Sequence, residues 1–301
     1  MIDFSFCEID PFRAYGGGNG NKIGIVYRGK TYMLKFPPAD KKRGAYTNSC
    51  ISEHLGCLIF ASTGLFDVQE TLYGTYTAHG KEKEVVACRD FTGDGFALME
   101  FAKVKNAHIT GSIEGSPGYS TELDEVLEAI DTQHLVDPIE VRRFFWNMFI
   151  MDAYLGNFDR HNGNWGFLVN EKERTAKLAP IYDCGSCLYT QLPTEKMNGI
   201  LEDPNEIEHR IYVFPNAALK IHGQKINYHN FIAENTYEEC TAALKRVLPR
   251  IEQDKIDALI SSCDFLSPTQ KKFYITMLRA RREKILHAAL SIVEPRVLLQ
   301  G

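Results

Sequence analysis

The sequence lacks several features that would place it in a common class of protein. Its N-terminus has no basic segment followed by an apolar run, and no apolar stretch approaches the roughly 20 residues that a membrane-spanning helix needs. It also has no basic block, and its formal charge over 301 residues is −5. We therefore expect a cytoplasmic protein that neither spans a membrane nor binds nucleic acid. Export without a classical signal peptide stays open.

Cysteine is scattered along the chain rather than clustered. The 8 cysteines lie in a chain too long to need disulfide staples, so we expect reduced thiols, mostly in the core. Cys184 and Cys187 form one C-x-x-C, but no second such pair exists to complete a zinc site. Whether this pair is redox-active stays open. The sequence has no internal repeat, and 44% hydrophobic residues suffice for the packed core of one or two domains.

The most informative stretch is the polar run from Asn157 to Asn164, which directly follows an apolar segment. Asp159 and Asn164 are separated by four residues, the spacing of the catalytic loop of kinase-type enzymes. In such a loop the Asp orients the attacking hydroxyl and accepts its proton, and the Asn holds a metal ion. Gly163 lets the backbone turn so that the two side chains converge. The alternative is that the run is only a polar turn.

The other half of this site is expected downstream. Asp183 follows the strand-like residues Ile181 and Tyr182 and stands two residues before Gly185, which is the shape of the kinase metal-binding D-x-G motif. A hairpin formed by residues 165–169 and 175–178 would return Asp183 to the side of Asp159. Asn164 and Asp183 are therefore the predicted ligands of Mg²⁺.

Together these residues resemble the HipA-like serine/threonine kinases, and most closely their short CtkA-type branch. The pattern that carries the resemblance is Asn-x-Asp-x-His-x-x-Asn at 157–164, followed by Ala-Pro-Ile-Tyr-Asp at 179–183. The resemblance extends from Gly16 to the C-terminal helices. It implies an α+β, bilobal protein-kinase-like fold. Residues 1–91 would form a nucleotide-binding lobe with a small antiparallel β-sheet and one helix, and residues 92–301 a larger, mainly helical lobe.

A glycine-rich turn precedes the predicted strand 23–27. Such a turn can lay backbone N–H groups over phosphates, because glycine permits conformations closed to other residues. It is not a Walker A loop, since Asn21 stands before Lys22 where that motif requires glycine. A plain flexible turn is the alternative. The predicted nucleotide-binding residues here are Gly16, Gly17, Gly18, Asn19 and Gly20.

Lys35 ends the second strand of a hairpin that turns at residues 28–30. A lysine flanked by apolar strand residues is costly unless it is paired. The kinase arrangement uses such a lysine to hold nucleotide phosphates and a helix glutamate. Glu53, in a helix expected over 45–63, is the predicted partner, and both residues are assigned to the nucleotide site. The alternative is a solvated lysine and a surface glutamate.

Further expectations concern single positions near the site. Cys88 and Arg89 belong to a segment, 87–91, expected to act as the hinge that binds adenine through its backbone. The resemblance places His161 near the nucleotide, with a catalytic or phosphate-facing role, and a structural histidine bonded to backbone is the alternative. Arg160 is a candidate to pair with a phosphate.

The remaining elements are assigned from apolar periodicity and capping residues. They are an edge strand at 2–9, strands at 68–76 and 84–91, a loop at 105–119, a core helix capped by Asp137, an irregular activation-type segment at 186–205, and helices at 237–247, 254–262 and 267–292. The basic run 279–284 is expected to be a solvated helix face, with docking to an acidic partner as the alternative.

The function implied is ATP- and Mg²⁺-dependent phosphorylation of a protein serine or threonine, with autophosphorylation. One rival is a lipid kinase, because residues 159–164 also resemble the phosphatidylinositol kinase loop, although Cys184 stands where those enzymes usually have Phe. The other is a pseudokinase interaction module, which predicts a missing active-site residue, and none is missing. HipA proteins carry an extra subdomain before the glycine loop, which here starts at Gly16. This leaves an exported effector kinase with a host partner, or a toxin subunit with an antitoxin.

Overall fold

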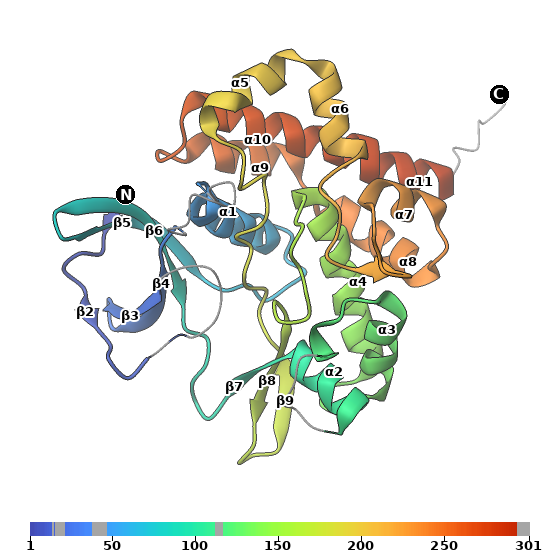
Figure 1. The fold of residues 1–301 in the computed structure, drawn as a ribbon, viewed down its shortest axis with the longest axis horizontal. Helices are drawn as coiled ribbons and strands as arrows, with labels where there is room; N and C mark the ends of the chain where they lie inside the picture. The colour runs from blue at the N-terminus through green and yellow to red at the C-terminus, as the bar shows by residue number, and fades with distance from the viewer. Residues whose placement is uncertain (14, 16–21, 38–46, 112–116, 294–301) are drawn as a thin grey trace.

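A computed structural model describes residues 1–13, 15, 22–37, 47–111 and 117–293. It has two lobes, a curled β-sheet with one helix and a larger helical lobe that also holds a small three-stranded sheet (Figure 1). Within the described residues, no helix combines the length and the apolar character that crossing a membrane requires. Whether a domain boundary falls at residue 91 stays a prediction.

The larger sheet has six strands in the order β1-β5-β6-β4-β3-β2, antiparallel except for the pair of β1 with β5. Its strands are β1 (Ile2–Asp3), β2 (Glu8–Ile9), β3 (Lys22–Tyr27), β4 (Lys30–Lys35), β5 (Thr71–Ala78) and β6 (Lys81–Arg89). The two long hairpins turn at two-residue connections, one of them Arg28-Gly29 with φ of 50° and 73°. These positive φ values match the twist of antiparallel strands. The hairpin predicted around Arg28 is confirmed.

The single edge strand predicted over residues 2–9 is wrong. Residues 2–3 and 8–9 pair at opposite edges of the sheet, because the chain turns between them. The turn is held by Ser5, whose N–H donates to Asp3 Oδ1 at 2.9 Å, and it buries Phe4 completely inside the sheet's curl. Burial of this one aromatic side chain outweighs continuation of a strand.

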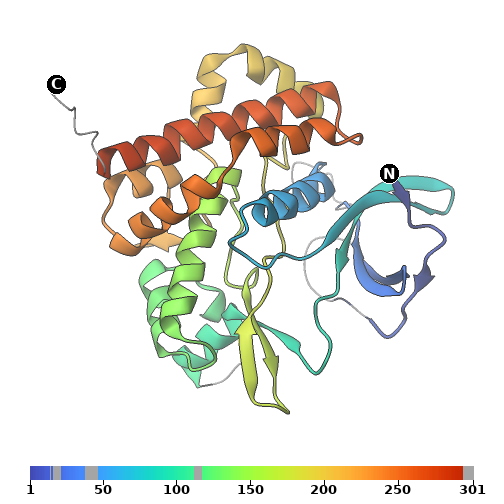
Figure 2. The ribbon, with the colours of Figure 1, turned by 180° about the vertical axis from the view of Figure 1, so that it is seen from behind.

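Helix α1 (Ser49–Ser62) packs across β5 and β6 and faces the helical lobe with its other side (Figure 2). It matches the predicted helix at 45–63 over most of its length, while residues 45 and 46 lie outside the described part of the chain. Gly56 lets α1 approach the segment after Asp183, since a Cβ there would lie 2.7 Å from Cys184 Cβ. The helix therefore links the sheet to the predicted metal-binding motif.

Helix α4 (Pro138–Leu155) runs through the centre of the helical lobe. Its N-terminus is capped as predicted, with Asp137 accepting from the N–H of Ile139 at 2.9 Å and Pro138 at the first helical position. It ends at Gly156, which adopts the left-handed conformation with φ of 67°. The next residue is Asn157, so the helix delivers the chain directly into the predicted catalytic loop.

The loop predicted over 105–119 is partly wrong, because helix α2 (Phe101–Thr110) occupies its first half. Lys105, expected in a loop, is fully buried, and its ammonium bonds the Glu125 carboxylate at 2.6 Å and the Ser120 carbonyl at 2.9 Å. This pairing lets a cation lie on the inner face of the helix. The activation-type segment at 186–205 also contains an unpredicted helix, α5 (Thr194–Glu202).

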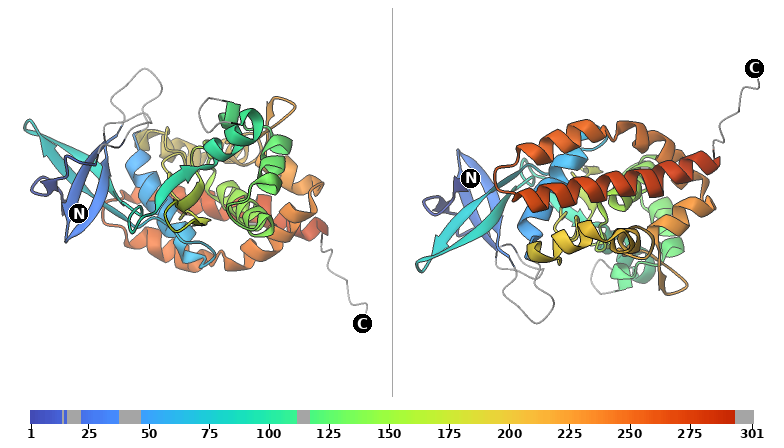
Figure 3. Two further views of the ribbon diagram at one scale, coloured as in Figure 1. Left: turned by 90° about the horizontal axis from the view of Figure 1, so that it is seen from below. Right: turned by 90° about the horizontal axis from the view of Figure 1, so that it is seen from above.

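The remaining elements complete the helical lobe. They are β7 (Ala97–Glu100), β8 (Gly166–Asn170), β9 (Thr175–Leu178), α3 (Leu123–Thr132), α6 (Pro204–Tyr212), β10 (Lys220–Ile221), β11 (Gln224–Lys225), α7 (Tyr228–Glu234), α8 (Glu238–Val247), α9 (Gln253–Ser262), α10 (Pro268–Arg281) and α11 (Ala288–Val293). The hairpin of β8 and β9 and the three C-terminal helical regions are confirmed. A π-helical turn at 282–287 joins α10 to α11 in one long rod along the helical lobe (Figure 3).

Candidate active site

Hydrogen bonds fold the segment after α4 into a tight loop. Asn157 Oδ1 accepts from the N–H of Asp159 at 3.1 Å, and Asn164 Nδ2 donates to the Asp159 carbonyl at 2.8 Å. The backbone turns at His161, whose N–H donates to the Asp159 carbonyl and whose carbonyl accepts from the N–H of Asn164. The Asn164 amide therefore lies against the backbone of Asp159 within one tight loop.

The carboxylate of Asp159 has no hydrogen-bond partner among the residues that the structure describes, although the side chain is half-buried. Burial and the nearby charge of Asp183 raise the pKa of this carboxyl, and the charge of Lys225 opposes that rise. A carboxylate with a raised pKa and free lone pairs is suited to accept a proton from an incoming hydroxyl.

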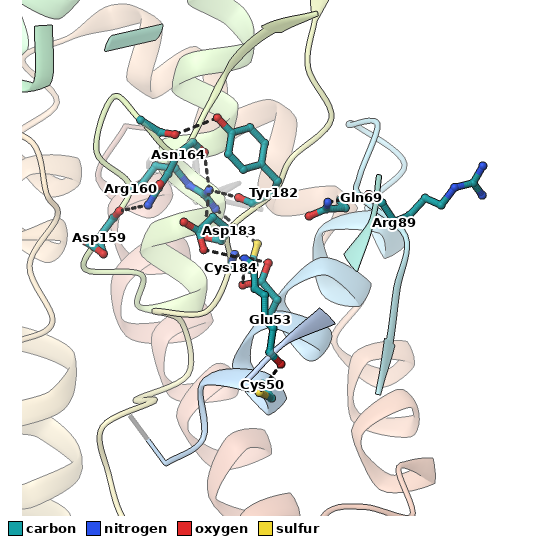
Figure 4. A network of polar contacts seen from close by, with 12 residues as sticks. Cys50, Glu53, Gln69, Arg89, Asp159, Arg160, Asn164, Tyr182, Asp183 and Cys184 are labelled. Carbon is teal, nitrogen blue, oxygen red and sulfur yellow. Dashed lines mark hydrogen bonds and ion pairs between the residues drawn. The ribbon is translucent and has the colours of Figure 1, made fainter. Parts of the chain in front are cut away.

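Arg160 ties the catalytic loop to the segment that leads to Asp183. Its Nη1 donates to the carbonyls of Asn164 at 3.0 Å and Tyr182 at 2.5 Å, and its Nε donates to Asp152 Oδ2 at 3.0 Å (Figure 4). The side chain is 5% exposed and that of Asp152 2%. The expectation that Arg160 pairs with a phosphate is wrong, because its guanidinium is used inside the protein. Its partner Asp152 lies eight residues earlier, in the last turn of α4, and no motif in the sequence singles it out.

Lys35 joins the two lobes at the site. Its ammonium lies 3.0 Å from Glu53 Oε2 and 3.1 Å from Asp183 Oδ1, residues far apart in the chain. Burial alone would lower the pKa of Lys35, but the Asp183 and Glu53 carboxylates raise it well above its usual value. The ammonium also outweighs the effect of burial on Asp183, whose pKa is lowered. Both groups are therefore charged across the physiological range.

The buried carboxylate of Glu53 binds two groups of the site, the Lys35 ammonium and the backbone N–H of Cys184. Its side chain is 2% exposed, one oxygen bonds Lys35, and the other accepts from the N–H of Cys184 at 3.2 Å. The predicted contact of Glu53 with Lys35 is present, and the assignment of Glu53 to the nucleotide site stays a prediction that this contact supports only through Lys35. Through these two bonds Glu53 fixes both Lys35 and the residue that follows Asp183.

Asp183 adopts an unusual backbone conformation, with φ of 55°. Non-glycine residues rarely occupy this left-handed region, and such strain persists only where the surroundings impose it. Here the flanking carbonyl of Tyr182 is held by Arg160 and the flanking N–H of Cys184 by Glu53. These bonds aim the Asp183 carboxylate at Lys35.

His161 is bonded to backbone. Its Nδ1 accepts from the N–H of Gly163 at 3.0 Å, which leaves the proton on Nε2. Of the two roles considered for this residue, the described contacts match the structural one, and the ring also lies edge-on to Tyr119.

The hinge residues differ from expectation. Cys88 is completely buried in β6, between β4 and β5. The N–H of Arg89 donates to the Glu70 carbonyl and its carbonyl accepts from Gln69 Nε2, both at 2.8 Å (Figure 4). The N–H of Asp90 donates to a carbonyl of β4. Arg89 is therefore a wrong assignment for an adenine contact that needs a free N–H group.

The predicted glycine-rich loop, Gly16 to Gly20 with Asn19, lies outside the described residues. Lys22, the first residue after it, is a cation that sequence reasoning did not assign to the site. Lys22 lies opposite Lys35 in the register of β3 and β4. Burial and the charge of Lys35 lower the pKa of Lys22, and the charge of Asp183 opposes this effect. Two lysines facing one carboxylate are an environment suited to phosphate groups.

Cys184 and Cys187 are both fully buried beside Cys57 of α1. Hydrogen bonds from the Cys187 and Cys57 thiols hold the pKa of Cys184 well below its usual value, although burial opposes them. Among the described residues, no group of metal-ligating side chains forms a zinc-type site. These thiols therefore lie in the core, as expected.

The chain is similar to known proteins in both sequence and fold. The sequence model of the HipA-like C-terminal domain matches residues 16–263. Serine/threonine-protein kinase CtkA of Helicobacter pylori strain J99 is 46% identical over 291 residues, which cover 96% of this chain and 87% of CtkA. The crystal structure of a Helicobacter pylori proinflammatory kinase CtkA gives a TM-score of 0.89 at 44% identity, covering 98% and 99% of the two chains. HipA of the Shewanella oneidensis toxin–antitoxin system, solved with HipB and operator DNA, gives 0.56 at 15% identity, covering 95% of this chain and 68% of that one, and shows the shared fold.

Proposed function

The chain belongs to the HipA-like family and is a protein serine/threonine kinase, and we propose that Asp159, Lys35 and Asp183 carry its phosphoryl transfer from ATP. The observation that supports this assignment is the contact of Lys35 with Asp183 on one side of the site and, on the other, the carboxylate of Asp159, which has no partner among the described residues. The spacing of residues in the sequence alone would not require these three distant residues to lie in one site.

Each residue has a role that its surroundings support. Asp159 orients the acceptor hydroxyl and takes its proton, because its carboxylate has no partner among the described residues and its pKa is raised. Lys35, held by Glu53, orients the phosphates of ATP. Lys22 adds a second positive charge on the same side.

The oxygens of Asn164 and Asp183 fit a hard divalent cation. Asn164 donates its Nδ2 to backbone, which leaves Oδ1 to face the site, and Asp183 keeps Oδ2 beside the oxygen that binds Lys35. Oxygen ligands of this kind suit Mg²⁺. When bound, Mg²⁺ supplies neutralisation of the charge on the transferred phosphoryl group.

The adenine contact falls further along the chain than residues 88 and 89. Phe91 is the first residue after β6 whose N–H has no partner among the described residues. We place the backbone donor to adenine at Phe91, beyond the sheet and beside the connection to the helical lobe.

The rival functions are not favoured. The lipid-kinase reading rested on residues 159–164 alone, whereas the relative named as a serine/threonine kinase matches 96% of the chain. The pseudokinase reading requires a missing active-site group, and Lys35, Asp159, Asn164 and Asp183 are all present.

The proposal is tested by incubating the purified protein with labelled ATP and Mg²⁺, alone and with a generic serine-containing protein. We expect label in both, on serine or threonine, and a loss of roughly 10²–10⁴-fold in turnover for Asp159→Asn, because general-base catalysis contributes about that much. Asp254→Asn, on the exposed start of α9, is the matched control. Near-wild-type turnover in Asp159→Asn would remove Asp159 from the mechanism. Label in a phosphoinositide instead of protein would restore the lipid-kinase reading.

For the biological role, an effector kinase acting on another organism's protein is favoured over a toxin. The support is 46% identity to CtkA, of which a solved structure is described as proinflammatory, against 15% to HipA. Induced expression in a bacterium tests this choice. Growth arrest by the wild type but not by Asp159→Asn would favour the toxin role and a search for an antitoxin encoded nearby.

A further inference from the structure

The short hairpin of β10 and β11 places two lysines directly opposite each other, Lys220 and Lys225. Like charges directly opposite across two strands are destabilising unless something else compensates them. Neither ammonium forms an ion pair or hydrogen bond within the described part of the chain, and Lys225 is exposed. The hairpin therefore presents concentrated positive charge to whatever approaches it.

The hairpin is fixed beside the catalytic loop. The N–H of Lys220 donates to the Thr121 carbonyl at 2.8 Å, which anchors the hairpin to the segment before α3. Asn162 of the catalytic loop donates its Nδ2 to the carbonyls of Gly118 and Ser120, in the same segment, at 2.9 and 2.8 Å. The segment 118–121 is thus shared by the hairpin and the loop, and the two cannot move apart independently.

A second bond closes the arrangement from the other side. Tyr228, three residues after Lys225, donates its hydroxyl to the Asn157 carbonyl at 2.6 Å, at the first residue of the catalytic loop. These bonds hold the hairpin that carries Lys225 against the catalytic loop that carries Asp159. In keeping with this placement, the charge of Lys225 opposes the effect of burial on the pKa of the Asp159 carboxyl.

The basic run at 279–284, expected to be a solvated helix face with docking to an acidic partner as the alternative, is only partly solvated. Arg279 is exposed and Lys284 partly exposed, and they pair with Asp257 and Glu208, whereas Arg281 is buried against backbone carbonyls. Near the hairpin, one oxygen of the Glu122 carboxylate accepts from the N–H of Gly223 at 2.9 Å, and among the described residues Glu122 forms no ion pair with either lysine.

From this arrangement we propose that Lys225, with Lys220 beside it, binds an acidic side chain of the protein substrate close to the phosphorylated serine or threonine. The proposal rests on the kinase function assigned above and adds the class of substrate, an acidic peptide. A carboxylate bound there would be attracted by both ammonium groups and would reduce the repulsion between them.

The test compares two serine peptides that differ at one position near the acceptor, with Glu in one and Gln in the other. The quantity measured is the ratio of kcat/KM for the Glu peptide to that for the Gln peptide. An exposed ion pair is worth up to about 1 kcal/mol, so we expect the ratio to fall about fivefold in Lys225→Ala. Reversing the charge in Lys225→Glu should lower it roughly 25-fold and favour a third peptide with Lys at that position. The wild-type ratio should fall as salt is added.

Lys255→Ala is the matched control, because Lys255 is an exposed lysine of α9 whose partner is the exposed Glu252. It should leave the ratio unchanged. A wild-type ratio near one, or an unchanged ratio in Lys225→Glu, overturns the proposal. If Lys225→Glu has a lower melting temperature than the wild type, the kcat/KM ratio of Lys225→Ala and the salt dependence of the wild-type ratio test the proposal instead.

Autophosphorylation measured in the same preparations separates this inference from the function on which it rests. A wild type that labels neither itself nor any peptide contradicts the kinase assignment. A wild type that labels itself and both peptides equally contradicts only the role of Lys225.

Discussion

The buried ion pair of Asp152 with Arg160 is the part of the site whose loss should cost the most stability. Arg160 holds the carbonyls of Asn164 and Tyr182, and Asp152 is the one carboxylate paired with it among the described residues. Asp152→Asn removes the negative charge, and its amide can no longer accept from two N–H groups of the guanidinium. An unpaired cation would then lie in the core.

The expected size of the effect follows from the contacts that are lost. The Asp152 carboxylate accepts from Arg160 at 3.0 and 3.3 Å and from Asn157 Nδ2 at 2.9 Å. Breaking a buried pair by removing one partner costs about 3–5 kcal/mol, because the remaining charge is uncompensated. We expect the free energy of unfolding to fall by this amount. Kinase activity should fall as well, because the catalytic loop and the segment before Asp183 lose their common anchor.

Urea unfolding followed by circular dichroism, with labelled-ATP assays below the transition, measures both effects. Glu252→Gln is the control, because its pair with Lys255 is exposed and should be worth about 0–1 kcal/mol. Replacing both partners, with Asp152→Leu and Arg160→Met, should recover part of the stability but not the activity. A loss below about 1 kcal/mol in Asp152→Asn, with full activity, would refute the reasoning.

Three further predictions concern pH, metal and backbone. Asp159 must be deprotonated to act as a base, and burial raises its pKa, so kcat/KM should fall with decreasing pH at a midpoint above the usual Asp value of about 3.9. A midpoint at or below that value in the pH–rate profile contradicts the assignment. Removing divalent cations with EDTA should abolish phosphate transfer, and MgCl₂ should restore it; transfer that persists in EDTA would show that Asn164 and Asp183 need no ion. Gly156→Ala, at φ of 67° and with its Cβ 3.0 Å from Pro215 Cγ, should lower the free energy of unfolding by about 1–2 kcal/mol. Gly199→Ala, in α5 with open space around it, should not destabilise, and equal melting temperatures for the two variants would contradict the backbone argument.

Features set by neighbouring residues were predicted well. The turn at Arg28-Gly29, the cap at Asp137 and the tight loop from Asp159 to Asn164 depend on residues within a few positions of each other. Local backbone preference and short-range hydrogen bonds act similarly in most folds, so the pattern suffices to predict them.

Two of the errors have one physical cause. Arg160 was a candidate to pair with a phosphate and Lys105 was expected in a loop, and both are buried because each has a carboxylate partner. A charged side chain can be buried in the core only when an oppositely charged partner is also present there. Which residue supplies that partner depends on how other segments pack. The same holds for Arg89, whose N–H is taken by the strand-flanking residue Glu70.

By itself the sequence determined most helices other than α2 and α5, the turn at residues 28–29 and the polar loop after α4, because those depend on short-range geometry. The tertiary structure alone decided that Lys35 contacts Asp183, that Arg160 is buried, and that Lys220 and Lys225 face each other across a hairpin. These outcomes depend on which distant segments pack together, and a charge becomes an anchor, a ligand or a recognition group only through the neighbours that packing gives it.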